Sequence, residues 1–176
     1  MNDRIKIGDL EINLRDLADF IVRGKKNSYA SGKEPERLPD GSERMIFKDG
    51  IWHYEDIWEG TNQGMGSERV WASQYQKYSS EENSPTIWRM DYMWSIMPFC
   101  INYRGYIKQI FSFLKKSLSQ VTPERPLRGP EHYREGDFGY QSRVNGDIRR
   151  FDGSERIISF DIVYIGNFHG GLLIRK

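Results

Sequence analysis

The chain has 176 residues, enough for one domain that buries about 70% of the surface its unfolded form exposes. Its 26 Lys and Arg residues balance 25 Asp and Glu residues without a long run of one sign, so nothing indicates a nucleic-acid or acidic-membrane partner. Cys100 is the single cysteine, and neither a signal peptide nor an apolar run of about 18 residues occurs, so we expect a cytoplasmic protein without a membrane span.

The first predicted elements are a short edge strand and a helix. Residues 5–12 have the composition of a strand. Asn13 suits a helix N-cap, and apolar residues recur at helical spacing after it. We expect a helix over residues 14–23 that Gly24 ends.

Residues 24–43 are predicted to be a polar connector, because Gly, Pro and charged residues dominate it. A loop of this length inside a compact domain is commonly functional or mobile. One interpretation is a solvated loop, and the other is a lid that binds an anion through Lys25, Lys26 and backbone N–H groups. We take the solvated loop as the working interpretation.

The next segment predicts four strands, because aromatic and β-branched residues recur there between turn signals. Asp49 and Gly50 form a favoured two-residue hairpin turn, and a polar excursion at residues 76–85 separates the last two strands. We expect the strands at residues 44–48, 51–60, 65–75 and 86–96.

A second helix is expected at residues 106–121, where an apolar stripe recurs at helical spacing before Pro123 ends it. The order helix, strands, helix, strands with short turns predicts an α+β domain with an antiparallel sheet in each half. Turn signals at residues 145–146 and 152–153 divide the second set of strands, which we expect at residues 132–135, 137–144, 155–159 and 162–168.

Two stretches, residues 47–71 and 133–158, carry aromatic, glycine and charged residues in the same order. A Gly and a Tyr recur after 86 residues, and the motif Gly-Ser-Glu-Arg recurs after 87, which indicates one inserted residue. The sequence therefore predicts an internal duplication inside a single domain. The two similar halves, residues 13–98 and 102–174, would be related by a pseudo-two-fold axis.

Side chains alternate between the two faces of a strand, so each strand can be divided into two sets. Trp52, Tyr54, Asp56 and Trp58 share a face whose counterpart in the second copy is apolar and aromatic, so we expect this face to be buried. Aromatic walls around an acid indicate a pocket. The predicted pocket residues are Tyr29, Trp52, Tyr54, Asp56, Trp58, Glu68, Trp88, Tyr92, Trp94, Glu155, Phe168 and His169.

A buried carboxylate must be paired or hydrogen-bonded, which leaves two interpretations of the inward acids. In the structural one, Glu68 accepts bonds from aromatic side chains or pairs with an Arg. In the functional one, the pocket binds a cationic or nucleotide-like small molecule, and the protein is a non-catalytic binding or sensor domain. The first copy is the expected site, because the second has Ser142 and Val144 in place of Asp56 and Trp58.

An enzyme is the first alternative, a hydrolase or lyase that uses Glu68 or Asp56 together with His169 as acid and base. The three histidines lack metal-ligand spacing and Cys100 stands alone, so we expect no metal and no cofactor.

A protein-interaction module is the second alternative. Trp71 and Tyr75 are predicted to be exposed beside residues 76–85, and aromatic residues are enriched at interfaces. The partners we expect are a small organic ligand and a homodimer, with no nucleic acid bound directly and no membrane.

Several short motifs occur along the chain from Leu14 onward, among them Asn27-Ser28-Tyr29-Ala30, Trp52-x-Tyr54-x-Asp56, Gly66-x-Glu68-x-Val70, Trp88-x-Met90-Asp91-Tyr92, Arg128-Gly129-Pro130 and Phe168-His169-Gly170-Gly171. Together they resemble the signature of an uncharacterised bacterial and archaeal domain-of-unknown-function family. Some of its members follow an XRE-type helix-turn-helix, which implies a sensor role. The chain departs from the family at Asp91, where relatives usually carry Asn, near Met93-Trp94, where they carry Gly, and in the extra segment 76–85.

Overall fold

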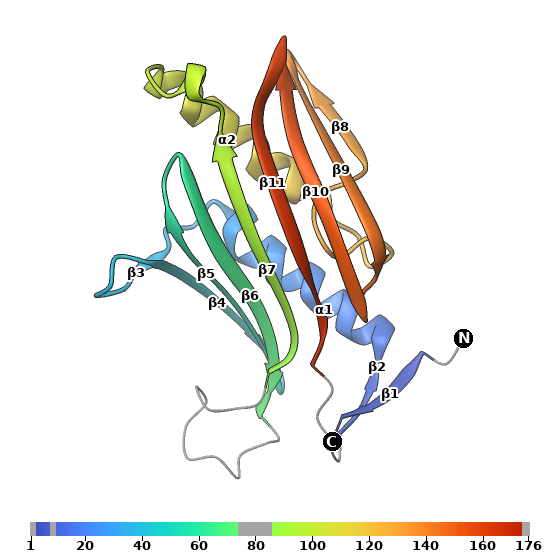
Figure 1. Ribbon diagram of the computed structural model, residues 1–176. Helices are drawn as coiled ribbons and strands as arrows, with labels where there is room; N and C mark the ends of the chain where they lie inside the picture. The colour runs from blue at the N-terminus through green and yellow to red at the C-terminus, as the bar shows by residue number, and fades with distance from the viewer. Residues whose placement is uncertain (1–2, 8–9, 74–85, 174–176) are drawn as a thin grey trace.

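The computed structural model describes residues 3–7, 10–73 and 86–173. Its main body is a nine-stranded antiparallel sheet of order β3-β4-β5-β6-β7-β11-β10-β9-β8. Helices α1 (Leu14–Asn27) and α2 (Arg104–Leu118) both lie behind this sheet in Figure 1, against what we call its inner face. The predicted α+β class with antiparallel pairing is confirmed, although the strands join into one sheet and not one in each half.

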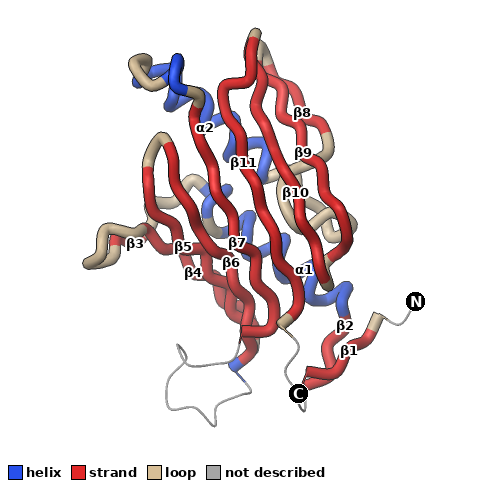
Figure 2. The backbone as a smooth tube through the Cα atoms, in the orientation of Figure 1, coloured by secondary structure: helices blue, strands red, loops and turns tan. Residues whose placement is uncertain are grey.

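The strands follow the predicted order along the chain (Figure 2), and half of the predicted ones are longer than predicted. Beside a short hairpin of β1 (Arg4–Ile7) and β2 (Leu10–Asn13), the sheet strands are β3 (Glu36–Arg37), β4 (Glu43–Asp49), β5 (Trp52–Gly60), β6 (Gln63–Ala72), β7 (Thr86–Ile96), β8 (His132–Glu135), β9 (Phe138–Asp147), β10 (Arg150–Ser159) and β11 (Asp161–Leu172).

The predicted edge strand at residues 5–12 is instead this hairpin, which forms a two-stranded sheet of its own. The predicted N-cap of α1 is confirmed, because the Asn13 side chain accepts a hydrogen bond from the backbone N–H of Arg15 at 2.8 Å. The polar connector that follows α1 contains the 3-10 helix η1 (Tyr29–Ser31) and strand β3.

Gly24 does not end α1, contrary to the prediction. The helix continues to Asn27, and Gly24 is buried where α1 crosses β5. A β-carbon at this position would lie 2.5 Å from Cγ of Tyr54, so glycine allows the close approach of helix and strand. The extension adds Lys25 to the buried face of the helix.

The predicted turns at residues 145–146 and 152–153 lie inside β9 and β10, and the chain turns between them at residues 148–149. Gly153 is needed for packing: a β-carbon there would lie 2.4 Å from the ring of Phe168. Helix α2 starts before the predicted residue 106 and ends at Leu118, before the predicted residue 121.

Two apolar clusters join the helices to the inner face. Phe20 and Ile21 of α1 pack with Tyr54 and Trp88, and a second cluster joins α2 to β9, β10 and β11. No helix among the described residues is long and apolar enough to cross a membrane.

The contact between α1 and β5 makes a testable prediction at Gly24. Alanine favours helices by about 1 kcal/mol over glycine, yet Gly24→Ala should lower the free energy of unfolding by about 1–3 kcal/mol, because its methyl group overlaps the Tyr54 ring. Gly105→Ala in α2 is the matched control, since a β-carbon there meets nothing within 4 Å. Urea unfolding of both variants measures the difference, and stabilisation of both would contradict the assigned contact.

Candidate functional site

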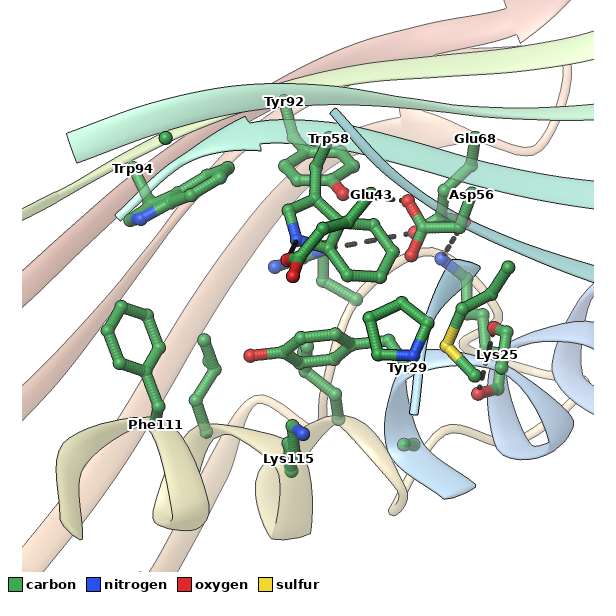
Figure 3. Close-up of a pocket in the computed structure, with 18 of the residues that line it drawn as sticks. Lys25, Tyr29, Glu43, Asp56, Trp58, Glu68, Tyr92, Trp94, Phe111 and Lys115 are labelled. Carbon is green, nitrogen blue, oxygen red and sulfur yellow. Dashed lines mark hydrogen bonds and ion pairs between the residues drawn. The ribbon is translucent and has the colours of Figure 1, made fainter. Parts of the chain in front are cut away.

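A cavity of about 440 Å³ lies between the two helices and the inner face of the sheet, and we call it the central cavity (Figure 3). Its size is within the range of small-molecule sites. Three groups of residues supply its principal walls: Lys25, Ser28 and Tyr29 at the end of α1 and in η1; Tyr54, Asp56, Trp58, Glu68, Tyr92 and Trp94 on β5 to β7; and Phe111, Lys115 and Arg128 on α2 and the loop after it.

The structure brings a part of the predicted pocket residues together around this cavity, namely Tyr29, Tyr54, Asp56, Trp58, Glu68, Tyr92 and Trp94. Trp52 and Trp88 lie on the same face of the sheet as these residues but pack in the apolar cluster that contains Phe20 and Ile21 of α1. The Trp52 ring lies 5.7 Å from that of Phe20. Phe168 lies in the same cluster, and Glu155 is buried beside the cavity without lining it.

His169 is exposed and follows the buried Phe168 on β11, so it points to the outer face of the sheet. Asp56 and Glu68 line the cavity on the inner face. The predicted pairing of His169 with either acid is therefore wrong, because the sheet separates them.

The predicted exposure of Trp71 is also wrong. Its side chain is buried, with its ring stacked on His53 at 5.1 Å and the guanidinium of Arg69 over it at 4.6 Å. Tyr75 and residues 76–85 lie outside the described residues. The described residues contain no cluster of three or more His, Cys, Asp and Glu side chains that could hold a metal ion.

Sequence reasoning missed two buried cations at the cavity, Lys25 and Arg128. A signal for Lys25 was present, since Leu17, Ile21 and Lys25 recur at intervals of four residues and lie on one face of a continued helix. Arg128 lies in the loop after α2, where no periodicity indicates its direction.

These cations form a chain of buried ion pairs with two acids. Lys25 contacts Glu68, and Nη1 of Arg128 lies 3.7 Å from the other Glu68 oxygen. Nη2 of Arg128 donates to Glu155 at 2.6 Å. Burial acts to raise the pKa of Glu155, but the charge of Arg128 and hydrogen bonds from it and two tyrosines outweigh burial and lower the pKa. Glu68 and Glu155 are thus held by cations, as the structural interpretation proposes.

Asp56 does not take part in this chain of buried ion pairs. Its carboxylate accepts a hydrogen bond from the hydroxyl of Tyr92 at 2.7 Å, and no Lys or Arg lies within ion-pair distance of it in the described part of the sequence. Burial and the negative charge of Glu68 raise the pKa of Asp56 to about 7. Two cations face three acids in this region, so Asp56 is the acid without a counter-charge.

Hydrogen bonds and ring contacts fix the aromatic walls. Trp58 donates its indole N–H to Glu43 at 2.8 Å, and Tyr29 meets the Trp58 ring edge-on with centroids 5.7 Å apart. Trp94 donates to the carbonyl of Thr61 at 3.1 Å, and its ring lies 6.0 Å from that of Tyr92. The rings are therefore positioned before any ligand arrives.

Comparison with known proteins finds a match to one family model. The model described as Domain of unknown function (DUF5680) matches residues 56–173, which is more than half of the chain. No curated protein and no solved structure matches. The resemblance to an uncharacterised family is thereby confirmed over this range, while the organisms that carry it and the helix-turn-helix neighbour stay expectations.

The ion-pair chain predicts the effect of Glu68→Gln. This change removes the charge that Lys25 contacts in a buried position, so the free energy of unfolding should fall by about 3–5 kcal/mol. Glu59→Gln, an exposed position on the neighbouring strand β5, is the control and should change stability by less than about 0.5 kcal/mol. Thermal melts at pH 7 compare the two, and equal melting temperatures would remove Glu68 from the stabilising network.

Asp56→Asn should reveal the raised pKa through stability against pH. The unfolded chain loses the Asp56 proton near pH 3.8 and the folded protein near pH 7, so this group weakens the wild-type fold as pH rises across that window. Relative to wild type, the variant should gain stability between pH 4 and 7 by a few kcal/mol in order of magnitude, with no further gain above pH 8. Denaturant unfolding at pH 5 and pH 8 measures this. A pH-independent difference would mean that Asp56 titrates normally.

Proposed function

Since the chain belongs to the DUF5680 family, whose function is unknown, we propose from its own residues that it is a non-catalytic domain that binds a small organic ligand, cationic or nucleotide-like. The central cavity is the binding site. The protein acts as a sensor of that ligand.

The observation that carries this proposal is Asp56. It is a buried carboxylate that faces the cavity without a basic partner among the described residues, so a positive group on a ligand would supply the missing charge. Ionised Asp56 opposite a ligand cation removes the electrostatic penalty that raises its pKa.

The aromatic rings around Asp56 support the same class of ligand. Tyr29, Trp58, Tyr92 and Trp94 present π-faces and edges to the cavity, and such rings attract cations and stack on flat heterocycles. The ring of Tyr92 is already covered by the guanidinium of Arg128, whose carbon lies 5.0 Å from the ring centroid. Lys115 lies at the same distance from the Tyr29 ring, so Trp58 and Trp94 are the two of these four rings that have no cation over them among the described residues.

We infer that the two predicted halves, residues 13–98 and 102–174, arose by duplication around a pseudo-two-fold axis. The strand registers support this, because equivalent residues of the two copies form equivalent cross-strand rows. These rows are Tyr54-Val70-Trp88 and Asp56-Glu68-Met90 in one half and Tyr140-Ile157-Tyr164 and Ser142-Glu155-Gly166 in the other.

The second half has Ser142 and Val144 at the positions of Asp56 and Trp58, so it lacks both the unpaired acid and the indole. This difference supports a single site in the first half. A homodimer and a cytoplasmic location stay predictions of the sequence.

Ligand screening by thermal shift and tryptophan fluorescence tests the proposal, because Trp58 and Trp94 line the cavity. Cationic and nucleotide-like compounds should raise the melting temperature of the wild type and quench its fluorescence. Asp56→Asn should weaken the best compound at least about ten-fold, since a charge-assisted contact contributes about 1.5–3 kcal/mol.

Asp152→Asn is the matched control, since Asp152 is an exposed acid on β10 outside the central cavity, and it should leave affinity unchanged. Equal affinity of the Asp56→Asn variant and the wild type would contradict the proposed role of Asp56. A response to no compound of either class would contradict the proposed function.

A further inference from the structure

Lys115 lines the central cavity from α2, on the side opposite the sheet. Its ammonium nitrogen lies 5.0 Å from the centroid of the Tyr29 ring. No carboxylate of the described residues lies within ion-pair distance of it, although the neighbouring Lys116 contacts Glu135. Lys115 is thus a cation that faces the cavity without an acidic partner in the described part of the chain.

The other charges at the rim do not neutralise Lys115. Glu43 accepts the indole N–H of Trp58 and lies 3.8 Å from Arg37. Lys33 and Glu34 are exposed, adjacent in sequence and opposite in charge.

Among the described cavity residues that are at least partly buried, two charged side chains of opposite sign therefore have no ion pair, Asp56 and Lys115. Asp56 lies at its sheet side and Lys115 at its α2 side, and the Tyr29 ring lies between them in Figure 3. Asp56 and Lys115 do not form an ion pair with each other: Asp56 contacts Tyr92, and Lys115 lies beside Tyr29. A ligand with one charge would satisfy only one of them.

We propose that the ligand is an aromatic or otherwise flat zwitterion whose protonated amine pairs with Asp56 and whose acidic group, a carboxylate or a phosphate, pairs with Lys115. This inference rests on the proposed function and narrows the ligand class. The flat part of the molecule lies against Tyr29 and the apolar side chains of α2, Phe111 and Leu114, which also line the cavity. Lys115 can pair with a bound anion while its ammonium group stays beside the Tyr29 ring, and such a charge-assisted contact is stronger than a neutral hydrogen bond.

A matched panel tests this on the full chain. Each of several ring systems is supplied as an arylalkylamine, as the same amine with a carboxylate, as the same amine with a phosphate, and as the carboxylate without the amine, and dissociation constants are measured by calorimetry. The wild type should bind a zwitterionic form at least about ten-fold more tightly than the amine of the same ring. The carboxylate without the amine should bind most weakly, and comparison of the two zwitterions identifies the acidic group.

Lys115→Met should remove the gain from the acidic group while the affinity for the plain amine stays within about two-fold. Lys115→Arg keeps the charge and should retain the gain. Lys108→Met, an exposed position on the same helix, should behave as the wild type. Thermal melts confirm that each variant is folded before binding is measured.

Amines that bind as tightly as their zwitterionic forms would overturn the zwitterion while the proposed function stands. A gain that persists in Lys115→Met would overturn the assignment of the acidic group to Lys115. Failure of every ring system in all four forms would overturn the binding function, and this inference with it.

Discussion

The buried ion pairs between Lys25, Glu68, Arg128 and Glu155 are the interaction on which the cavity depends. They connect the end of α1 to β6, and β6 through the loop after α2 to β10. Removing ions from water costs free energy, so these buried charges are tolerated only because each one has a partner of opposite charge. Tyr140 and Tyr164 also donate hydrogen bonds to the carboxylate of Glu155. The result is a polar wall of fixed geometry in an otherwise apolar interior.

The energetics of Asp56 differ from those of its neighbours. A paired acid such as Glu155 has a lowered pKa and favours the folded state at neutral pH, while the raised pKa of Asp56 opposes folding there. A neutral residue at this register would avoid that penalty, and Ser142 occupies the corresponding place in the second half. A strongly shifted pKa of this kind is typical of binding and catalytic positions.

Periodicity in the sequence was sufficient for the α+β class, the order of the elements and the inward direction of Asp56, Tyr92 and Trp94. It failed where glycine serves packing, because Gly24 and Gly153 look like breakers or turns until the ring that each one meets is known. That error placed Lys25 in a loop and hid half of the ion-pair chain. Arg128 required the three-dimensional path of the loop after α2, which no local pattern contains. The sequence therefore located the acids of the site but not the cations that distinguish a paired acid from an unpaired one.

The position of Tyr29 suggests how a ligand signal would reach the rest of the molecule. Tyr29 belongs to the short η1 helix that directly follows α1, and its ring contacts Trp58 on the sheet and Lys115 on α2. A ligand that contacts Asp56, Tyr29 and Lys115 together would join the sheet and both helices, and binding energy shared among them stabilises one arrangement of the three. Because α1 and α2 make few direct contacts and both contact η1, the proposed ligand would act on how firmly the two helices are held against the sheet. This is the physical change that a sensor domain requires.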